Sequence, residues 1–269
     1  MNLDVLAIGA HPDDVELCVG GTLAALVREG YRVGIVDCTR GEYGTRGSAS
    51  LRLEEARRAQ EILGVHRREF LDMPDSAVAP TEDAIIELVR VLRQYRPHVV
   101  LFPPPFERHP DHEAVHRIVR SAYFKSGLAR LRTFGPDGTE QEPYRPARLY
   151  SYIQAYHHEA DFFVDISQTF EQKLEAIRAY ASQVYVPERY RSDEPETVLS
   201  RPDFLESVVA RALLGKYDRC ALRRRLPGSR AAWASFAQRA LPVAATSPHG
   251  ASPKSSAPAQ RACWSPHPQ

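Results

Sequence analysis

The chain is 269 residues long, with 43% hydrophobic and 26% charged side chains, which is enough to bury the core of one sizeable domain. No run of about eighteen apolar residues occurs, so the sequence excludes a membrane-spanning helix. The formal net charge is +1, but acidic residues end at Asp218 while basic ones continue to Arg261, which leaves residues 1–216 net acidic. We therefore expect no nucleic-acid partner and no membrane partner.

The first residues enter an apolar stretch directly, without the basic segment and small-residue cleavage site of an export signal. Cys18 and Cys38 lie in regularly patterned segments, whereas Cys220 and Cys263 lie in an unpatterned one, so no disulfide framework is predicted. Both observations favour a cytoplasmic protein.

The first third of the chain alternates between two kinds of pattern. Residues 3–10 and 32–39 are short apolar runs typical of buried strands, and residues 20–31 between them have helical character. Residues 50–64 carry apolar side chains at helical spacing and end in a glycine, and residues 68–74 follow as a third strand. The order strand, helix, strand predicts βαβ units.

The pattern continues through the middle of the chain. Thr81 is the predicted N-cap of a helix that ends before Pro97, and residues 98–105 form the fourth strand. Strands and helices that alternate in this way indicate right-handed crossovers. We predict a single α/β domain with a Rossmann-like, mostly parallel sheet covered by helices on both faces.

The remaining elements extend this domain to residue 216. Residues 112–127 are predicted as a helix, 148–154 as a strand, 162–167 as another strand and 169–183 as a helix.

Two clusters of histidine and aspartate follow predicted strands. AHPDD begins at Ala10, after the first strand, and RHPDH begins at Arg108, after the fourth. Ligands of open parallel sheets bind at the carboxyl ends of the strands, so the clusters are expected to meet. His11, Asp14 and His112 would give a zinc ion three protein ligands and leave one position for water. Either cluster alone is better explained by helix capping, and Asp14 is also a candidate N-cap.

The other polar residues of the clusters have chemistry to offer. Asp13 is suited to accept a proton from water as general base. His109, if protonated, would stabilise an oxyanion, and Asp111 would orient its ring.

AHPDDVE at residues 10–16 and HPDH at 109–112 resemble the LmbE-like or PIG-L superfamily of zinc-dependent N-deacetylases. The segment LRLEEARRAQEILGV, the MPD near Met73 and YASQ at 180–183 are similar to the branch that deacetylates N-acetylglucosaminyl malate in bacillithiol synthesis. The resemblance implies the same metal ligands and the same roles for Asp13, His109 and Asp111. It also implies a homo-oligomer that acts on a small sugar conjugate with Zn²⁺, or with Fe²⁺ or Mn²⁺ in its place.

Arg52 and Arg108 are predicted to bind the anionic aglycone, because a guanidinium pairs with a carboxylate through two hydrogen bonds. Two alternatives stay open at this point. In the first, the enzyme acts on another N-acetylglucosaminide; in the second, the chain is a non-catalytic sugar- or nucleotide-binding module.

Residues 217–269 depart from the family. They are rich in Ala, Pro, Ser and Arg, and we expect a disordered, low-complexity tail. Back-translation of residues 217–227, read one base later, gives MIGARYAAGF, which resembles the strand-forming end of the relatives. We interpret the tail as the product of a frameshift, which resequencing of the gene tests.

Overall fold

Five short parallel strands form the centre of the molecule, seen in a computed structural model that describes residues 1–217. The strand order is β3-β2-β1-β4-β5, and every neighbouring pair is parallel. The predicted α/β fold with a parallel sheet is confirmed. The strands span Val5–Gly9 (β1), Val33–Asp37 (β2), Arg67–Phe70 (β3), Val99–Phe102 (β4) and Arg148–Ser151 (β5).

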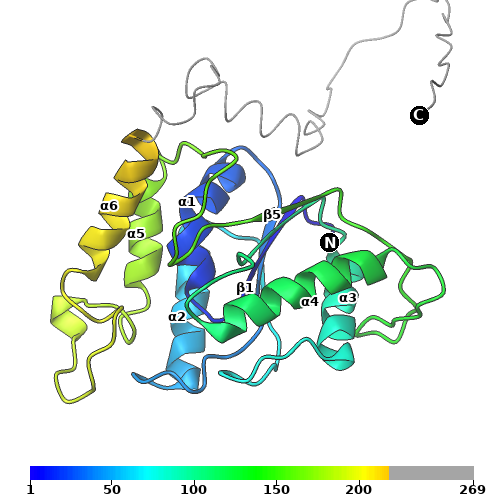
Figure 1. Ribbon diagram of the computed structural model, residues 1–269, viewed down its shortest axis with the longest axis horizontal. Coiled ribbons are helices and arrows are strands. Elements are labelled where there is room, and N and C mark those ends of the chain that lie inside the picture. Colours follow the sequence, from blue (N-terminus) through cyan, green and yellow to red (C-terminus); the bar gives the residue numbers. More distant parts are fainter. Residues whose placement is uncertain (218–269) are drawn as a thin grey trace, which may run out of the picture.

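Helices cover both faces of this sheet (Figure 1). Helices α1, α2 and α5 lie on one face, α3 and α4 lie on the other, and α6 packs on the outside of α5. The helices span Asp14–Arg28 (α1), Ala49–Leu63 (α2), Glu82–Tyr95 (α3), Pro110–Ser126 (α4), Phe170–Arg178 (α5) and Phe204–Tyr217 (α6), with a 3₁₀ turn, η1, at Pro187–Arg189.

Local sequence signals set several helix ends. Thr81 caps α3, because its side chain accepts a hydrogen bond from the backbone N–H of Ala84, as predicted. Ser48 caps α2 through the N–H of Leu51, and Gly64 ends that helix with the left-handed φ of 70° that glycine adopts without strain.

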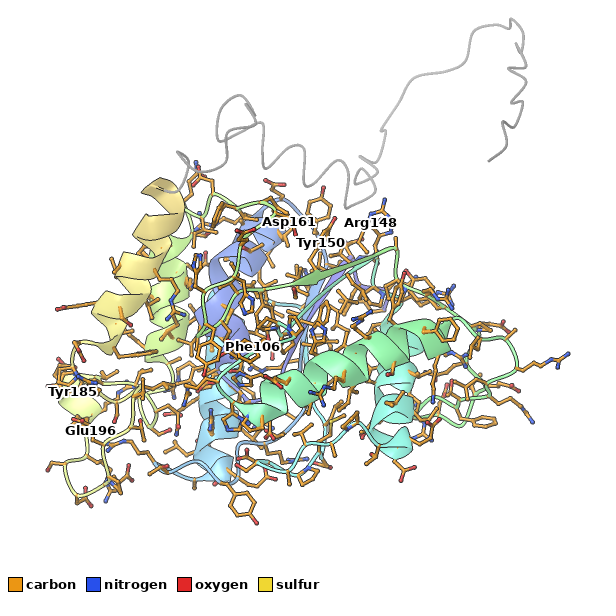
Figure 2. All side chains as sticks on the ribbon, viewed as in Figure 1. Phe106, Arg148, Tyr150, Asp161, Tyr185 and Glu196 are labelled. Atoms are coloured by element: carbon orange, nitrogen blue, oxygen red, sulfur yellow. The ribbon has the colours of Figure 1, made fainter. Side chains whose placement is uncertain are left out.

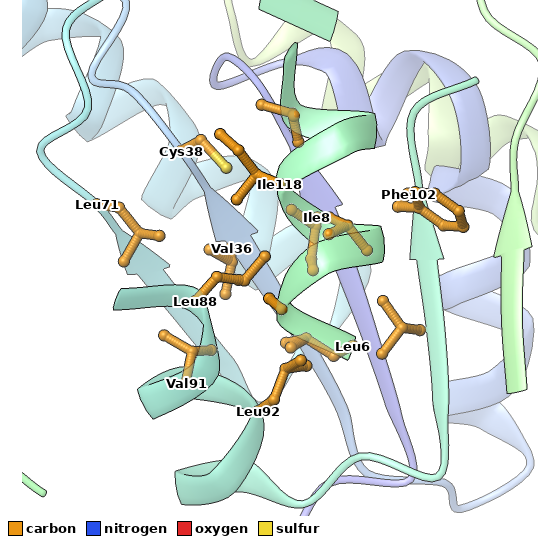
Figure 3. Packing of buried hydrophobic residues seen from close by; sticks show 14 of the residues in the cluster. Leu6, Ile8, Val36, Cys38, Leu71, Leu88, Val91, Leu92, Phe102 and Ile118 are labelled. Carbon is orange, nitrogen blue, oxygen red and sulfur yellow. The ribbon is translucent and has the colours of Figure 1, made fainter. Parts of the chain in front are cut away.

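The core consists of two apolar layers, one on each face of the sheet. On the α3–α4 face, Leu6 and Ile8 of β1 pack against Leu88 of α3 and Ile118 of α4 (Figure 3). The opposite layer joins β1 and β2 to α1, α2 and α5. Arg148 and Tyr150 mark β5, the strand at one edge of the sheet (Figure 2). Because β1, β2 and β4 are buried on both faces, their sequences are apolar runs without alternation.

The second half of the chain differs from the prediction in two places. The strand expected at residues 162–167 is wrong, because this segment is irregular and lies on the helical layer, where the side chain of Ile166 packs against Gly21 of α1. Helix α6 was not predicted. The tail expected at residues 217–269 lies, apart from Tyr217, outside the described residues, and none of the described helices is long and apolar enough to cross a membrane.

The strand order reverses between β1 and β4. From β1 the chain builds outward to β2 and β3 on one side, and it later returns to add β4 and β5 on the other. The loops that leave the carboxyl ends of β1 and β4 therefore diverge and leave a crevice, which is where ligands bind in sheets of this kind.

Candidate metal centre

Both predicted clusters lie at this crevice. The turn from β1 into α1 carries His11, Asp13 and Asp14, and the N-terminus of α4 carries His109 and His112. One oxygen of Asp14, Oδ2, accepts hydrogen bonds from the backbone N–H groups of Ala10 (3.1 Å) and His11 (2.9 Å). This side chain is therefore fixed by its own turn, with its carboxylate directed at the second cluster.

Three donor atoms from the two clusters converge on one point. His11 Nδ1 lies 3.3 Å from His112 Nε2, and Asp14 Oδ2 lies 3.5 Å from His11 Nδ1 and 3.3 Å from His112 Nε2. A tetrahedral zinc ion with ligands at about 2.0–2.1 Å separates its donor atoms by roughly 3.3–3.4 Å. The spacing of these three donors, two imidazole nitrogens and a carboxylate oxygen, therefore fits a divalent metal ion.

The second nitrogen of His11 is held by two carboxylates. Nε2 lies 3.1 Å from Asp75 Oδ1 and 3.2 Å from Asp111 Oδ2. Burial lowers the pKa of His11, but hydrogen bonds to Asp111, Asp14 and Asp75 outweigh it and raise the pKa well above its usual value. Such carboxylate partners fix the ring orientation of a metal-binding histidine.

Asp111 thus contacts a different histidine from the predicted one. Its carboxylate bonds to the ring of His11 and accepts the backbone N–H groups of Ser76 (2.7 Å) and Val78 (3.3 Å). Its link to His109 is through the backbone, because the N–H of Asp111 donates to His109 Nδ1 over 3.2 Å. The expected orientation of the His109 ring by a carboxylate is replaced by helix capping.

This capping bond determines the tautomer of His109. Since Nδ1 accepts a hydrogen bond, the ring proton of the neutral form is on Nε2. Burial, together with His11 and His112, lowers the pKa of His109 below its usual value. The lowered pKa favours the neutral form of His109, whose Nε2–H is then a hydrogen-bond donor.

Asp13 is buried beside the three donor atoms, with 4% of its surface exposed. Burial raises its pKa to about 6; Arg52 opposes the rise and Asp14 adds to it. The φ of Asp13 is 120°, a value that few residues other than glycine, asparagine and aspartate adopt. Backbone strain of this kind is concentrated at functional sites.

The two predicted aglycone-binding arginines have different surroundings. Arg52 is buried and donates to Asp13 Oδ2 (2.7 Å) and to the carbonyl of Pro12 (3.0 Å). Arg108 is exposed, and within residues 1–217 its guanidinium has no hydrogen-bond partner. Both side chains line a cavity of about 2570 Å³ that contains the converging donor atoms.

Two residues of the site were not predicted. Asp75 belongs to the MPD segment after β3 and arrives at the crevice for the same reason as the other clusters, so its position after a strand was a usable signal. Gln154 follows β5, and its Nε2 donates to Asp14 Oδ1 over 2.7 Å. A lone glutamine carries no sequence signal of this kind.

A parallel α/β sheet whose switch point carries a His–Asp–His cluster, a buried acid and a further histidine is typical of metal-dependent hydrolases. Residues 6–123 match the profile of the family described as PIG-L, GlcNAc-PI de-N-acetylase. A diacetylchitobiose deacetylase of Thermococcus kodakarensis is 35% identical over 66% of this chain and 69% of its own. A 1D-myo-inositol 2-acetamido-2-deoxy-alpha-D-glucopyranoside deacetylase of Mycobacterium is 30% identical over 68% and 74%.

The solved structures agree with the sequence matches. A conserved protein of Thermus thermophilus superposes with a TM-score of 0.68 and 35% identity, over 82% of this chain and 90% of that one. The chain belongs to the PIG-L/LmbE-like deacetylase family. It is an enzyme of the deacetylase class, as the sequence predicted.

Proposed function

We propose that this enzyme is a divalent-metal-dependent hydrolase that removes the acetyl group from an N-acetylglucosamine conjugate. The observation that carries the proposal is the convergence of His11, Asp14 and His112 on one point beside a buried carboxylate, Asp13. Both curated relatives described above are named as deacetylases of N-acetylated sugars, which supports this class of substrate.

His11, Asp14 and His112 would hold the metal, with Zn²⁺ proposed and Fe²⁺ or Mn²⁺ as alternatives. When bound, the metal supplies a Lewis acid that polarises the acetyl carbonyl and acidifies water. Asp75 and Asp111 keep the His11 ring in place, and Gln154 keeps the Asp14 carboxylate in place.

Asp13 is proposed to accept the proton of the attacking water. The hydroxyl oxygen then forms a bond to the acetyl carbon, and the C–N bond breaks as the protonated Asp13 returns its proton to the leaving amine. Acetate and the free amine are the products, so atoms and charge balance. Arg52 holds Asp13 Oδ2 and leaves Asp13 Oδ1 for this proton.

His109 is proposed to stabilise the transition state as a neutral donor. Its Nε2–H is available to donate to the carbonyl oxygen as negative charge develops there. A neutral imidazole also avoids a third positive charge beside the metal and Arg52.

For the aglycone, we propose malate as in the bacillithiol precursor, with Arg108 as its first contact, because the Arg108 guanidinium has no hydrogen-bond partner within residues 1–217, whereas Arg52 is engaged by Asp13. The names of the relatives favour instead an uncharged aglycone, a second sugar or inositol.

The test is acetate release by the metal-loaded enzyme from N-acetylglucosaminyl malate, diacetylchitobiose and inositol N-acetylglucosaminide. Release from the malate conjugate at the highest kcat/KM is expected. A higher value for either uncharged substrate contradicts malate and leaves the deacetylase proposal intact. No release from any of the three, with stoichiometric metal bound, contradicts the sugar deacetylase.

A further inference from the structure

Helix α5 places a lysine against α1 in the wall of the same cavity. Lys173 is buried, with 6% of its surface exposed, and its described contact is a long hydrogen bond of 3.5 Å from Nζ to the carbonyl of Cys18. An ammonium group has three N–H donors, so within the described chain two of them are left without a partner, at a residue that lines the cavity.

The charges around Lys173 make its position unfavourable in the absence of a ligand. Within residues 1–217, no carboxylate interacts with its ammonium, and the nearby titratable groups are the thiol of Cys18 and the guanidinium of Arg211 on α6. Burial lowers the pKa of Lys173 to about 8; Cys18 opposes this fall and Arg211 adds to it. Buried charges are normally paired, and among the residues that the structure describes this one has no counter-charge.

Arg211 connects this wall to the metal centre. Its guanidinium donates to the carbonyl of Gln154, whose side chain donates to the metal-ligand candidate Asp14. Cys18, which contacts Lys173, follows Asp14 by four residues on α1, a rise of about 6 Å along the helix. Lys173 therefore contacts α1 about one helical turn beyond the metal-ligand candidate Asp14.

Part of the cavity wall formed by α1, α5 and α6 is apolar. Leu17 of α1, Phe170 of α5, and Phe204 and Val208 of α6 form a small cluster there and also line the cavity. Low polarity strengthens the attraction between a cation and an anion in the same space.

We propose that Lys173 and Arg211 form an anion subsite that binds a carboxylate or phosphate group on the aglycone of the substrate. This inference rests on the proposed deacetylase function and specifies the substrate class of that site: an N-acetylglucosamine conjugate whose aglycone carries an oxyanion. The ammonium of Lys173 and the guanidinium of Arg211 would then obtain a counter-charge that the described chain does not provide.

The test compares Lys173→Met with wild type on N-acetylglucosaminyl malate and on methyl N-acetylglucosaminide. We expect the ratio of the two kcat/KM values to fall by about ten- to a hundredfold, the effect of one charge-assisted hydrogen bond. Lys173→Arg, which keeps the charge, should restore part of the ratio. Lys125→Met, which removes a lysine that is paired with Glu82, is the matched control and should leave the ratio unchanged.

Ligand binding separates this inference from the deacetylase proposal. In an Asp13→Asn background, the dissociation constants of N-acetylglucosaminyl malate and N-acetylglucosamine 1-phosphate are measured by calorimetry, and both should rise at least about tenfold in Lys173→Met. The ligand whose dissociation constant rises more carries the group that the subsite prefers, carboxylate for the malate conjugate or phosphate for the 1-phosphate.

Three results are informative. If the ratio and the dissociation constants change in Arg108→Ala but not in Lys173→Met, the subsite is overturned and the deacetylase proposal stands. If acetate is never released but both anions lose affinity in Lys173→Met, the subsite stands and the deacetylase proposal fails. If wild type binds charged and uncharged ligands equally, the subsite is overturned whatever the activity.

Discussion

The two ends of the cavity differ in how their buried charges are partnered. At the metal end, Asp13 pairs with Arg52, Asp14 contacts His11 and His112, and the carboxylates of Asp75 and Asp111 share the other nitrogen of His11. At the α5–α6 end, the buried cation Lys173 lies near the exposed Arg211 and faces no carboxylate in the described chain.

The partnered arrangement continues beneath the metal end. Arg68 is buried between Asp37, which it binds through two nitrogens at 2.6 and 2.9 Å, and Glu16, which also accepts a hydrogen bond from Tyr180. Charges that are satisfied within the chain hold its parts together, whereas an unsatisfied buried charge costs stability unless a ligand pairs with it. The comparison therefore distinguishes residues that build the site from residues that select its ligand.

The largest effect is expected at the metal end, for His112→Ala. This change removes one of three converging donors and should reduce the bound metal from one ion per chain to none, with loss of activity on every substrate. Metal content of the purified protein is the measurement. Full occupancy in the variant would remove His112 from the ligand set.

Asp13→Asn should retain the metal and lower kcat/KM by about 10²–10⁴-fold for charged and uncharged substrates alike. The amide keeps an oxygen to accept from Arg52, and asparagine has nearly the shape of aspartate, so the surrounding structure is expected to be preserved. Loss of metal together with activity would mean that the roles of Asp13 and Asp14 are exchanged.

How far the sequence predicts this arrangement depends on the range of the interactions. The alternation of apolar runs and helical patterns identifies the strands and helices up to residue 126, and the rule for strand ends then brings His11 and His112 together. The contact of Asp111 with His11 depends on how α4 is set against the turn after β3, and the position of Lys173 depends on α5 packing on α1. Such contacts are decided by tertiary packing and leave no periodic signal.

The wrong prediction of a strand at residues 162–167 has the same cause, because tertiary packing determines the conformation of this segment. Alternating apolar residues fit a strand, but they equally fit a segment whose Ile166 packs on Gly21, and only the folded structure distinguishes the two.

Arg68→Met tests the partnered region. It leaves the carboxylates of Asp37 and Glu16 buried without a cation, so we expect the free energy of unfolding to fall by about 3–5 kcal/mol. Arg67→Met is the matched control, because Arg67, the neighbour of Arg68 on β3, is exposed and pairs with Glu69; a change of at most about 1 kcal/mol is expected. Urea denaturation gives both values. Equal falls in the free energy of unfolding in the two variants would show that the buried ion pairs of Arg68 stabilise the protein no more than the exposed pair of Arg67.

The smallest effect is expected for Lys173→Met. This change should raise the free energy of unfolding, whereas Arg68→Met should lower it. Methionine fills the same space without a buried charge, so below pH 8 the variant should be more stable than wild type by up to about 3 kcal/mol in the absence of an anionic ligand. The pKa of Lys173 is about 8 in the folded state and 10.5 in the unfolded chain, so between these values the unfolded state binds more protons. The unfolding free energy of wild type therefore rises with pH through this window, and the advantage of the variant should shrink from pH 8 to pH 10.5.

The groups that face Lys173 do not obscure this dependence. Burial raises the pKa of the Cys18 thiol well above its usual value, which favours the neutral thiol. Denaturation of wild type, Lys173→Met and the control Lys125→Met at pH 7 and pH 10 measures the difference. A constant difference would show that the ammonium is already paired. Repeating the series in the Asp13→Asn background with saturating N-acetylglucosaminyl malate should remove the advantage at pH 7, since bound ligand then stabilises the protein with Lys173 more than the Lys173→Met variant.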